Sequence, residues 1–256
     1  MSLLLVCALA PALAQHTFPY PSMPDTLRTV EQRAAYLSTH YWDNFDFADT
    51  LALQDKELAE QGFVNFIDML SRFDQQVAQK GITAFTAKAY VHAASKEKFE
   101  NLIEEYCADN KSPLRNDLLY GQFLKAMKTS SCFDETEKER IDFKLKATLK
   151  HLPGDIASDF SFTLADGKLH HLSDYKDKKV ILYFYDPDCE NCHKIEEWFK
   201  KQTIPTNIEK LNIVANMPLS SLYDLKEMPT IYLLDKGNIV RLKDCTPEQL
   251  MQEISR

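Results

Sequence analysis

Apolar residues recur at three- and four-residue steps through much of the first 150 residues, the spacing that lines one face of a helix. Three such stripes cover 63–73, 99–106 and 120–127, and further helices are expected at 30–41, 84–94 and 135–149. Residues 28–152 are therefore predicted to form an all-helical domain whose stripes point into its core.

The pattern becomes that of strands from Pro153-Gly154 onward. Apolar and polar residues alternate over 160–164, Asp166-Gly167 supplies a turn, and 169–172 is again extended, so a hairpin is expected. The run 180–185 is apolar at every position, which is typical of a central strand buried on both faces of a sheet.

The remaining elements alternate between helix and strand. They are a helix at 189–201, a strand at 211–215, a brief helix at 220–225, a hairpin over 230–243 and a final helix from Thr246, which opens with a capping box. The predicted fold class is an all-α N-terminal domain followed by an α/β domain with a central mixed sheet flanked by helices.

The N-terminus is predicted to be an export signal. An apolar run from Leu3 ends in Ala12-Leu13-Ala14, so residues 1–14 are predicted to be a signal peptide cut after Ala14. A lipid anchor at Cys7 is the alternative, although Val6 is bulky for that motif. Residues 15–27 contain alternating prolines and are predicted to form an extended arm.

The first apolar run is too short to span a bilayer, and no later segment is continuously apolar over the required length. No transmembrane segment is therefore expected. The formal net charge is −8 and Lys and Arg are not clustered, which argues against nucleic acid as a partner. Trp42, Phe45 and Phe47 lie close together and are interpreted as an anchor in the helical core, with an exposed binding loop as the alternative.

Two cysteines stand where the buried strand gives way to a helix, in Cys189-Glu190-Asn191-Cys192. This spacing puts Cys189 at the helix N-terminus, where unpaired N–H groups stabilise a thiolate, and Cys192 about one turn further on. Cys189 is the expected nucleophile and Cys192 the expected resolving thiol.

Several motifs together resemble the TlpA/ResA-type branch of the thioredoxin superfamily, over residues 153–256. They are Phe160, Asp166-Gly167-Lys168, the strand 180–185, Asp188 with the two cysteines, and Met228-Pro229-Thr230. The helical region, with Phe18-Pro19-Tyr20-Pro21 and 41–47, resembles an uncharacterised domain found ahead of such modules in exported proteins of Gram-negative bacteria.

The resemblance implies a thioredoxin fold in which Pro229 follows a cis peptide bond beside the cysteines. The backbone of Met228, with Thr230 after it, would then bind an extended substrate segment as an added strand. The chain departs from the family pattern at Asp188, where Trp is usual, at Tyr183, where an acid is usual, and at Ile195, where a Glu assists. Glu196, Glu190 and His193 are the candidate supporting residues instead.

The expected function is an exported thiol–disulfide oxidoreductase that acts on disulfides of other exported proteins, in the periplasm or outside the cell. It needs no cofactor or metal, and a membrane or periplasmic donor would supply its electrons. Asp186, Asp188 and Glu190 oppose a thiolate at Cys189, so a reductase or isomerase is expected rather than a strong oxidant.

Other readings of the same residues compete with this one. The module could be a non-enzymatic adaptor in an interaction protein, and Cys189-x-x-Cys192-His193 is also the pattern of c-type haem attachment. A single CxxC argues against zinc. A peroxidatic site would ask for Thr at position 186, where the chain has Asp.

The other cysteines are outside this motif. Cys107 and Cys132 are candidates for a structural disulfide, which would stabilise the helical domain by about 3.5 kcal/mol, or else are two buried thiols. Cys245 is then left over, either as a free thiol or as an intermolecular link.

Overall fold

A computed structural model describes residues 17–164, 167–225 and 227–255. The predicted signal peptide, its cleavage after Ala14 and the alternative lipid site at Cys7 lie outside these residues. The chain divides into two compact units, one up to Leu102 and one from Ile103 onward. Across the described ranges, each helix is too short or too polar to cross a membrane.

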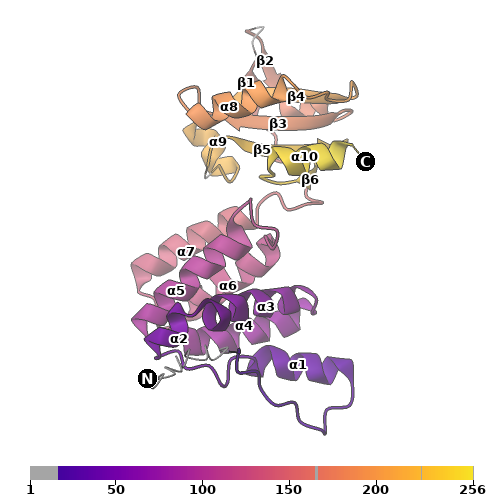
Figure 1. The fold of residues 1–256 in the computed structure, drawn as a ribbon. Helices are drawn as coiled ribbons and strands as arrows, with labels where there is room; N and C mark the ends of the chain where they lie inside the picture. Colours follow the sequence, from indigo (N-terminus) through magenta and orange to yellow (C-terminus); the bar gives the residue numbers. More distant parts are fainter. Residues whose placement is uncertain (1–16, 165–166, 226, 256) are drawn as a thin grey trace, which may run out of the picture. The chain divides into compact units, whose positions relative to one another are not determined.

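The first unit is built of helices (Figure 1). They are α1 Val30–His40, α2 Thr50–Gln54, the π-helical turn η1 Lys56–Glu60, α3 Gln61–Ser71, α4 Gln75–Ala89 and α5 Ala93–Ile103, whose last residue opens the second unit. Asp49, Asp55 and Asp74 cap the starts of α2, η1 and α4 by accepting backbone N–H groups.

Aromatic rings fill the core of this unit. Trp42 is only 2% exposed, and its ring centroid lies 5.2 Å from that of Phe85 and 5.3 Å from that of Phe99. Phe18 brings the N-terminal arm into the same cluster, 5.0 Å from Trp42. A Cβ on Gly62 would lie 2.4 Å from the Phe18 ring, so only glycine fits there. Trp42 is therefore a core anchor, as predicted, and not an exposed binding loop.

Two predicted helices were misplaced along the chain. The helix expected at 84–94 is wrong in its bounds, because α4 starts at Gln75 behind the Asp74 cap and ends at Ala89. The brief helix expected at 220–225 is α9, Met217–Leu222, which starts behind the Asn216 cap. In both cases a capping side chain sets the start.

The second unit begins with more helix, in the magenta and pink part of Figure 1. Its helical elements are the π-helical turn η2 Glu104–Ala108, α6 Asp117–Thr129 and α7 Glu135–Thr148. The Asn116 side chain caps α6, and Asp134 and Glu137 form a capping box at the start of α7. The predicted helical character of this region is thus confirmed. Its residues from Ile103 onward, however, belong to the second compact unit.

A mixed four-stranded sheet follows, with the strand order β4-β3-β5-β6 (Figure 1). Its strands are β3 Lys179–Tyr185, β4 Ile208–Val214, β5 Thr230–Asp235 and β6 Ile239–Leu242, and a separate hairpin consists of β1 Ser161–Thr163 and β2 Leu169–His171. β3 is parallel to β4 and antiparallel to β5, which makes it a central strand as its apolar run predicted.

Helices cover both faces of the sheet, which is why β3 is apolar throughout. Ile181 and Tyr183 of β3 pack on one face with α8 Glu190–Phe199 and α10 Pro247–Ile254. Val180, Leu182 and Phe184 pack on the other face with α9, η3 Leu172–Tyr175 and the hairpin. The predicted α/β fold with a central mixed sheet flanked by helices is confirmed.

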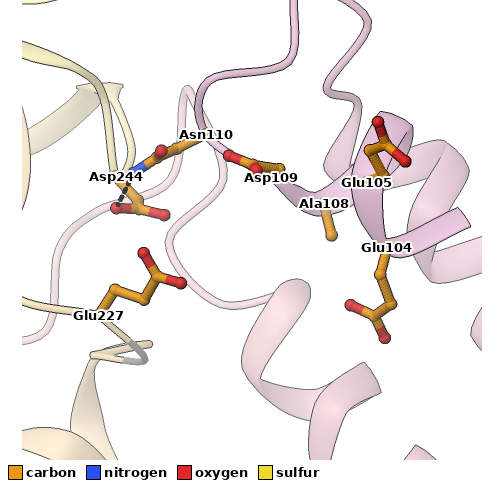
Figure 2. A pocket seen from close by; sticks show the side chains of 7 residues that line it. All are labelled: Glu104, Glu105, Ala108, Asp109, Asn110, Glu227 and Asp244. Atoms are coloured by element: carbon orange, nitrogen blue, oxygen red, sulfur yellow. Dashed lines mark hydrogen bonds between the residues drawn. The ribbon is translucent and has the colours of Figure 1, made fainter. Parts of the chain in front are cut away.

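Buried charges join residues 103–152 to the strands within the second unit. Lys243, 7% exposed, donates to the carbonyl of Thr148 at the end of α7 at 2.7 Å. Arg115 donates to the carbonyl of Asp244 at 2.6 Å. Asn110 donates to the Asp244 carboxylate at 3.2 Å (Figure 2). Because these bonds tie the two segments together, the compact unit starts at Ile103. The boundary at 152/153 remains a prediction based on the change of pattern.

Candidate active site

Cys189 stands at the start of α8, immediately after the loop that leaves β3. Its backbone N–H donates to the carbonyl of Asp186 at 3.1 Å, which closes the turn after the strand. The Cys189 sulfur acts as the helix cap and accepts the backbone N–H of Cys192 at 3.1 Å. A helix N-terminus stabilises a negative sulfur, so this position suits a thiolate.

Cys192 lies one turn along the helix and is buried, at 2% exposure, whereas Cys189 is half-buried. Burial raises the pKa of the Cys192 thiol to about 11, and its hydrogen bond with Cys189 acts in the same direction. The Tyr183 hydroxyl donates to the backbone carbonyl of Cys192 at 2.8 Å. The site therefore has one accessible sulfur and one protected sulfur, which matches a nucleophile and a resolving thiol.

The loop before β5 lies beside Cys189. The peptide bond between Met228 and Pro229 is cis, the isomer that the resemblance implied. The Cys189 thiol donates to the Met228 carbonyl across 3.6 Å, and the Asn191 amide donates to the same oxygen across 3.4 Å. Thr230, which is buried, donates its hydroxyl to the Glu227 carbonyl at 2.6 Å and so braces the loop.

A small cavity of about 120 Å³ opens next to Cys192. Its lining residues are Tyr183, Tyr185, Cys192, His193, Glu196 and Asn212. Glu196 also pairs with Lys210, with 2.7 Å between the carboxylate and the ammonium. Two of the three predicted supporting residues, His193 and Glu196, thus share a cavity with the buried cysteine.

Glu190, the third predicted supporting residue, is placed differently. Its side chain is 84% exposed and pairs with Lys194 one turn along α8, at 2.7 Å. Asn191 and Lys210 were not singled out from the sequence. Lys210 lies on β4, 18 positions after Cys192. Only the pairing of β3 with β4 brings its side chain near the cysteine site.

An acidic hollow of about 350 Å³ is lined in part by Glu227, from the loop before β5 (Figure 2). Its lining residues are Glu104, Glu105, Ala108, Asp109, Asn110, Glu227 and Asp244. Glu104 is already neutralised by Lys144, at 2.5 Å. In the described part of the chain, His, Cys, Asp and Glu side chains form no group suited to hold a metal ion.

The other cysteines lie away from this chemistry. Cys107 is a fully buried free thiol in η2, so the disulfide with Cys132 that the sequence left open is not formed. Cys132 follows α6 and is partly exposed. Cys245 is buried as a free thiol, and burial raises the pKa of both Cys107 and Cys245 to about 12. Thiols this hard to ionise are poor nucleophiles.

Comparisons with known proteins match two different families to successive parts of the chain. The family described as "Domain of unknown function (DUF5106)" matches residues 7–151, and the AhpC/TSA family matches residues 153–216. The comparison with curated proteins found no match.

Several of the solved structures that are similar to this chain come from Bacteroides. A thioredoxin-like protein from Bacteroides caccae is 29% identical, with 94% of this chain and 98% of that chain covered and a TM-score of 0.73. The C-terminal domain of an uncharacterized protein from Bacteroides fragilis is 24% identical, with 42% and 99% covered and a TM-score of 0.39. The thioredoxin domain of a thiol-disulfide oxidoreductase from Bacteroides vulgatus is 16% identical, with 41% and 96% covered and a TM-score of 0.31.

These matches confirm both resemblances: the C-terminal part is thioredoxin-like, and a helical domain of unknown function precedes it. The helical match covers more than half of the chain, and the Bacteroides caccae protein is similar over both parts. The chain belongs to the DUF5106 family and carries, after that helical domain, a thioredoxin-like module of the AhpC/TSA type.

Proposed function

We propose that this protein is an exported thiol–disulfide oxidoreductase of the reductase or isomerase type, with Cys189 as nucleophile and Cys192 as resolving thiol. One observation carries the proposal. The half-buried Cys189 sulfur lies at the N-terminus of α8, accepts the Cys192 N–H at 3.1 Å and is 3.6 Å from the Met228 carbonyl. Nucleophile, resolving residue and a backbone acceptor for substrate are thus together.

The reaction proceeds through a mixed disulfide. The Cys189 thiolate attacks one sulfur of the substrate disulfide, and that bond breaks as the other sulfur leaves and takes a proton from solvent. Cys192 then loses its proton and attacks Cys189. The Cys189–Cys192 disulfide forms, the second substrate thiolate is released, and two electrons have passed to the substrate.

The loop before β5 is proposed to hold the substrate. An extended segment can pair its backbone with Met228 as an added strand, with Pro229 and Thr230 fixing the loop. Asn191 donates to the Met228 carbonyl in the free protein, so a substrate N–H would share or replace that contact. Peptides with an extended stretch around the disulfide are therefore the proposed substrates.

The direction of electron flow follows from the charges around Cys189. Asp186, Asp188 and Glu190 all lie within three positions of it and are exposed. Negative charges disfavour a thiolate and so favour the oxidised pair, which makes the couple more reducing. An upstream donor in the membrane or periplasm is proposed to reduce Cys189–Cys192 again.

Burial also argues against the competing uses of this motif. Covalent haem attachment needs both sulfurs accessible to the porphyrin, and Cys192 is 2% exposed behind Tyr183. Peroxide reduction is not proposed, because Asp186 stands where Thr would be required. Export rests on the N-terminal pattern and is part of the proposal.

Insulin reduction by dithiothreitol tests the proposal. The wild-type protein is expected to accelerate precipitation of the insulin B chain, and Cys189→Ser is expected to abolish the acceleration because the attacking sulfur is gone. Cys132→Ser, which removes a thiol outside the site, serves as the matched control and should keep the wild-type rate. A wild-type protein without activity would favour a non-enzymatic adaptor.

A further inference from the structure

The Met228 carbonyl is the point where the loop before β5 meets the start of α8. Two donors converge on this oxygen, the Cys189 thiol across 3.6 Å and the Asn191 side-chain amide across 3.4 Å. A carbonyl oxygen has two lone pairs, so these donors engage both of its acceptor positions. The acceptor that an added substrate strand would use is therefore already occupied in the free protein.

The loop holds this oxygen in place from both sides. The Met228 side chain packs against the buried cluster on the face of the sheet that contains Phe184 and Tyr223. Across Met228, the Thr230 hydroxyl donates to the Glu227 carbonyl at 2.6 Å. Because the acceptor is fixed, a donor has to move away when a substrate N–H arrives.

The two donors differ in how easily they can move. The Cys189 sulfur is half-buried and also caps α8, so it stays beside the oxygen whether or not it carries a proton. The Asn191 side chain is exposed, and its contact with Met228 is the one hydrogen bond that its amide makes within the described residues. At 3.4 Å this bond is longer than usual, so the amide can turn into water at small cost.

A peptide that approaches from solvent therefore meets Asn191 first. A peptide N–H and the Asn191 amide N–H are donors of the same kind, so they compete for the same side of the Met228 carbonyl. A disulfide compound without peptide groups offers no such donor and leaves this contact undisturbed. The competition thus distinguishes peptide disulfides from other disulfides.

We propose that Asn191 is a specificity-determining residue that stands in for the substrate N–H in the free protein and has to be displaced before a peptide disulfide binds as an added strand. This inference rests on the proposed function and concerns substrate affinity at the same site. The amide leaves the Met228 carbonyl when the peptide binds and returns when the reduced product departs. Asn191 therefore weakens the binding of peptide disulfides and assists their release.

Two disulfides separate binding at the carbonyl from the reactivity of Cys189. Insulin presents peptide N–H groups around its disulfides, and Ellman's reagent has none. In the full chain carrying Cys132→Ser, Asn191→Leu is expected to raise kcat/KM for insulin about twofold to fivefold through a lower KM, the weight of one exposed hydrogen bond. The rate with Ellman's reagent should stay unchanged.

A second variant and a matched control accompany this measurement. Asn191→Ala also removes the amide and is compatible with a helix, so it should raise kcat/KM for insulin in the same way. Gln202→Leu removes an amide of the same kind just beyond the end of α8, where it donates to the Trp198 carbonyl at 3.4 Å. This control should leave the rates with both disulfides unchanged.

The outcomes separate this inference from the function on which it rests. An insulin KM in Asn191→Leu and Asn191→Ala that equals or exceeds the wild-type value would overturn the inference. Equal changes for insulin and Ellman's reagent would also overturn it, because the effect would then lie in the reactivity of Cys189. Both results leave the proposed function intact. A wild-type protein that does not reduce insulin would refute the proposed function and this inference with it.

Discussion

Tyr183 shows how one side chain can serve both the core and the site. Its ring is 1% exposed and packs between the sheet and α8, while its hydroxyl reaches the Cys192 carbonyl at 2.8 Å. Burial raises the pKa of this phenol, so it stays protonated and donates its hydrogen bond at every physiological pH. The Tyr183 hydroxyl therefore holds the first turn of α8 at any physiological pH.

Replacing Tyr183 with Phe should weaken the second unit. The change removes one buried hydrogen bond and keeps the ring, so the free energy of unfolding should fall by about 1 kcal/mol. Urea denaturation followed by circular dichroism measures the loss. Tyr185→Phe, a partly exposed tyrosine in the same strand, is the control and should change stability less. Equal losses for the two variants would contradict the role given to the Tyr183 hydroxyl.

The site residues that could be predicted from the sequence are those whose role depends on neighbouring positions in the chain. The spacing of Cys189 and Cys192 and the strand before them were enough to place one sulfur at a helix start and the other one turn on. Lys210 and Asn191 could not be found this way. Their partners, Glu196 and the Met228 carbonyl, lie 14 and 37 positions away and meet them only after the strands have paired.

The elements of the second unit begin where a side chain caps the first turn. In α10, the Gln249 N–H donates to the Thr246 hydroxyl at 3.2 Å, and the Thr246 N–H donates to the Gln249 side chain at 2.9 Å. Two residues three positions apart carry this signal, so the start of α10 was predicted correctly. The start of α9 was not, because Asn216 follows directly on the preceding strand region and its capping role is visible only in the fold.

Thr246→Ala should destabilise the second unit by about 1 kcal/mol, the typical cost of losing a helix cap. The reason is that the Gln249 N–H in the first turn of α10 loses the Thr246 hydroxyl that accepts it, while Leu250 of this helix packs against the sheet. Thermal or urea denaturation gives the value. Thr246→Ser keeps the hydroxyl and should retain most of the stability, and a loss equal to that of Thr246→Ala would count against the capping argument.

In the whole molecule, the division between units does not coincide with the change from helices to strands. Arg115 and the Asp244 carbonyl that it contacts are 129 positions apart, and both are held within the second unit. Periodicity shows which face of α6 is apolar but carries no information about such distant polar partners. The fold class could be predicted from the sequence, and the unit boundary could not.

The Asp244 carboxyl should make the stability of the second unit depend on pH. Burial raises its pKa from 3.8 to about 6, although Arg115 opposes this. The folded protein thus binds this proton more tightly than the unfolded chain, so the stabilisation is complete below about pH 4 and is lost as the pH rises through 6.

Asp244→Asn removes this titration. The free energy of unfolding of the wild type, minus that of Asp244→Asn, should fall by up to about 3 kcal/mol between pH 4 and pH 7, since one pKa unit corresponds to about 1.4 kcal/mol. Urea titrations at a series of pH values measure the difference. Two curves that run parallel over this interval would show that Asp244 has an ordinary pKa.

The contact between Lys243 and the end of α7 also bears on how the chain folds during synthesis. The Thr148 carbonyl accepts from Lys243 across 95 positions, so α7 leaves the ribosome long before its terminal partner has been translated. Domains generally fold as they emerge, from the N-terminus onward. The first unit can follow that order, whereas the bond between the end of α7 and Lys243 can form only after the hairpin of β5 and β6 has been made.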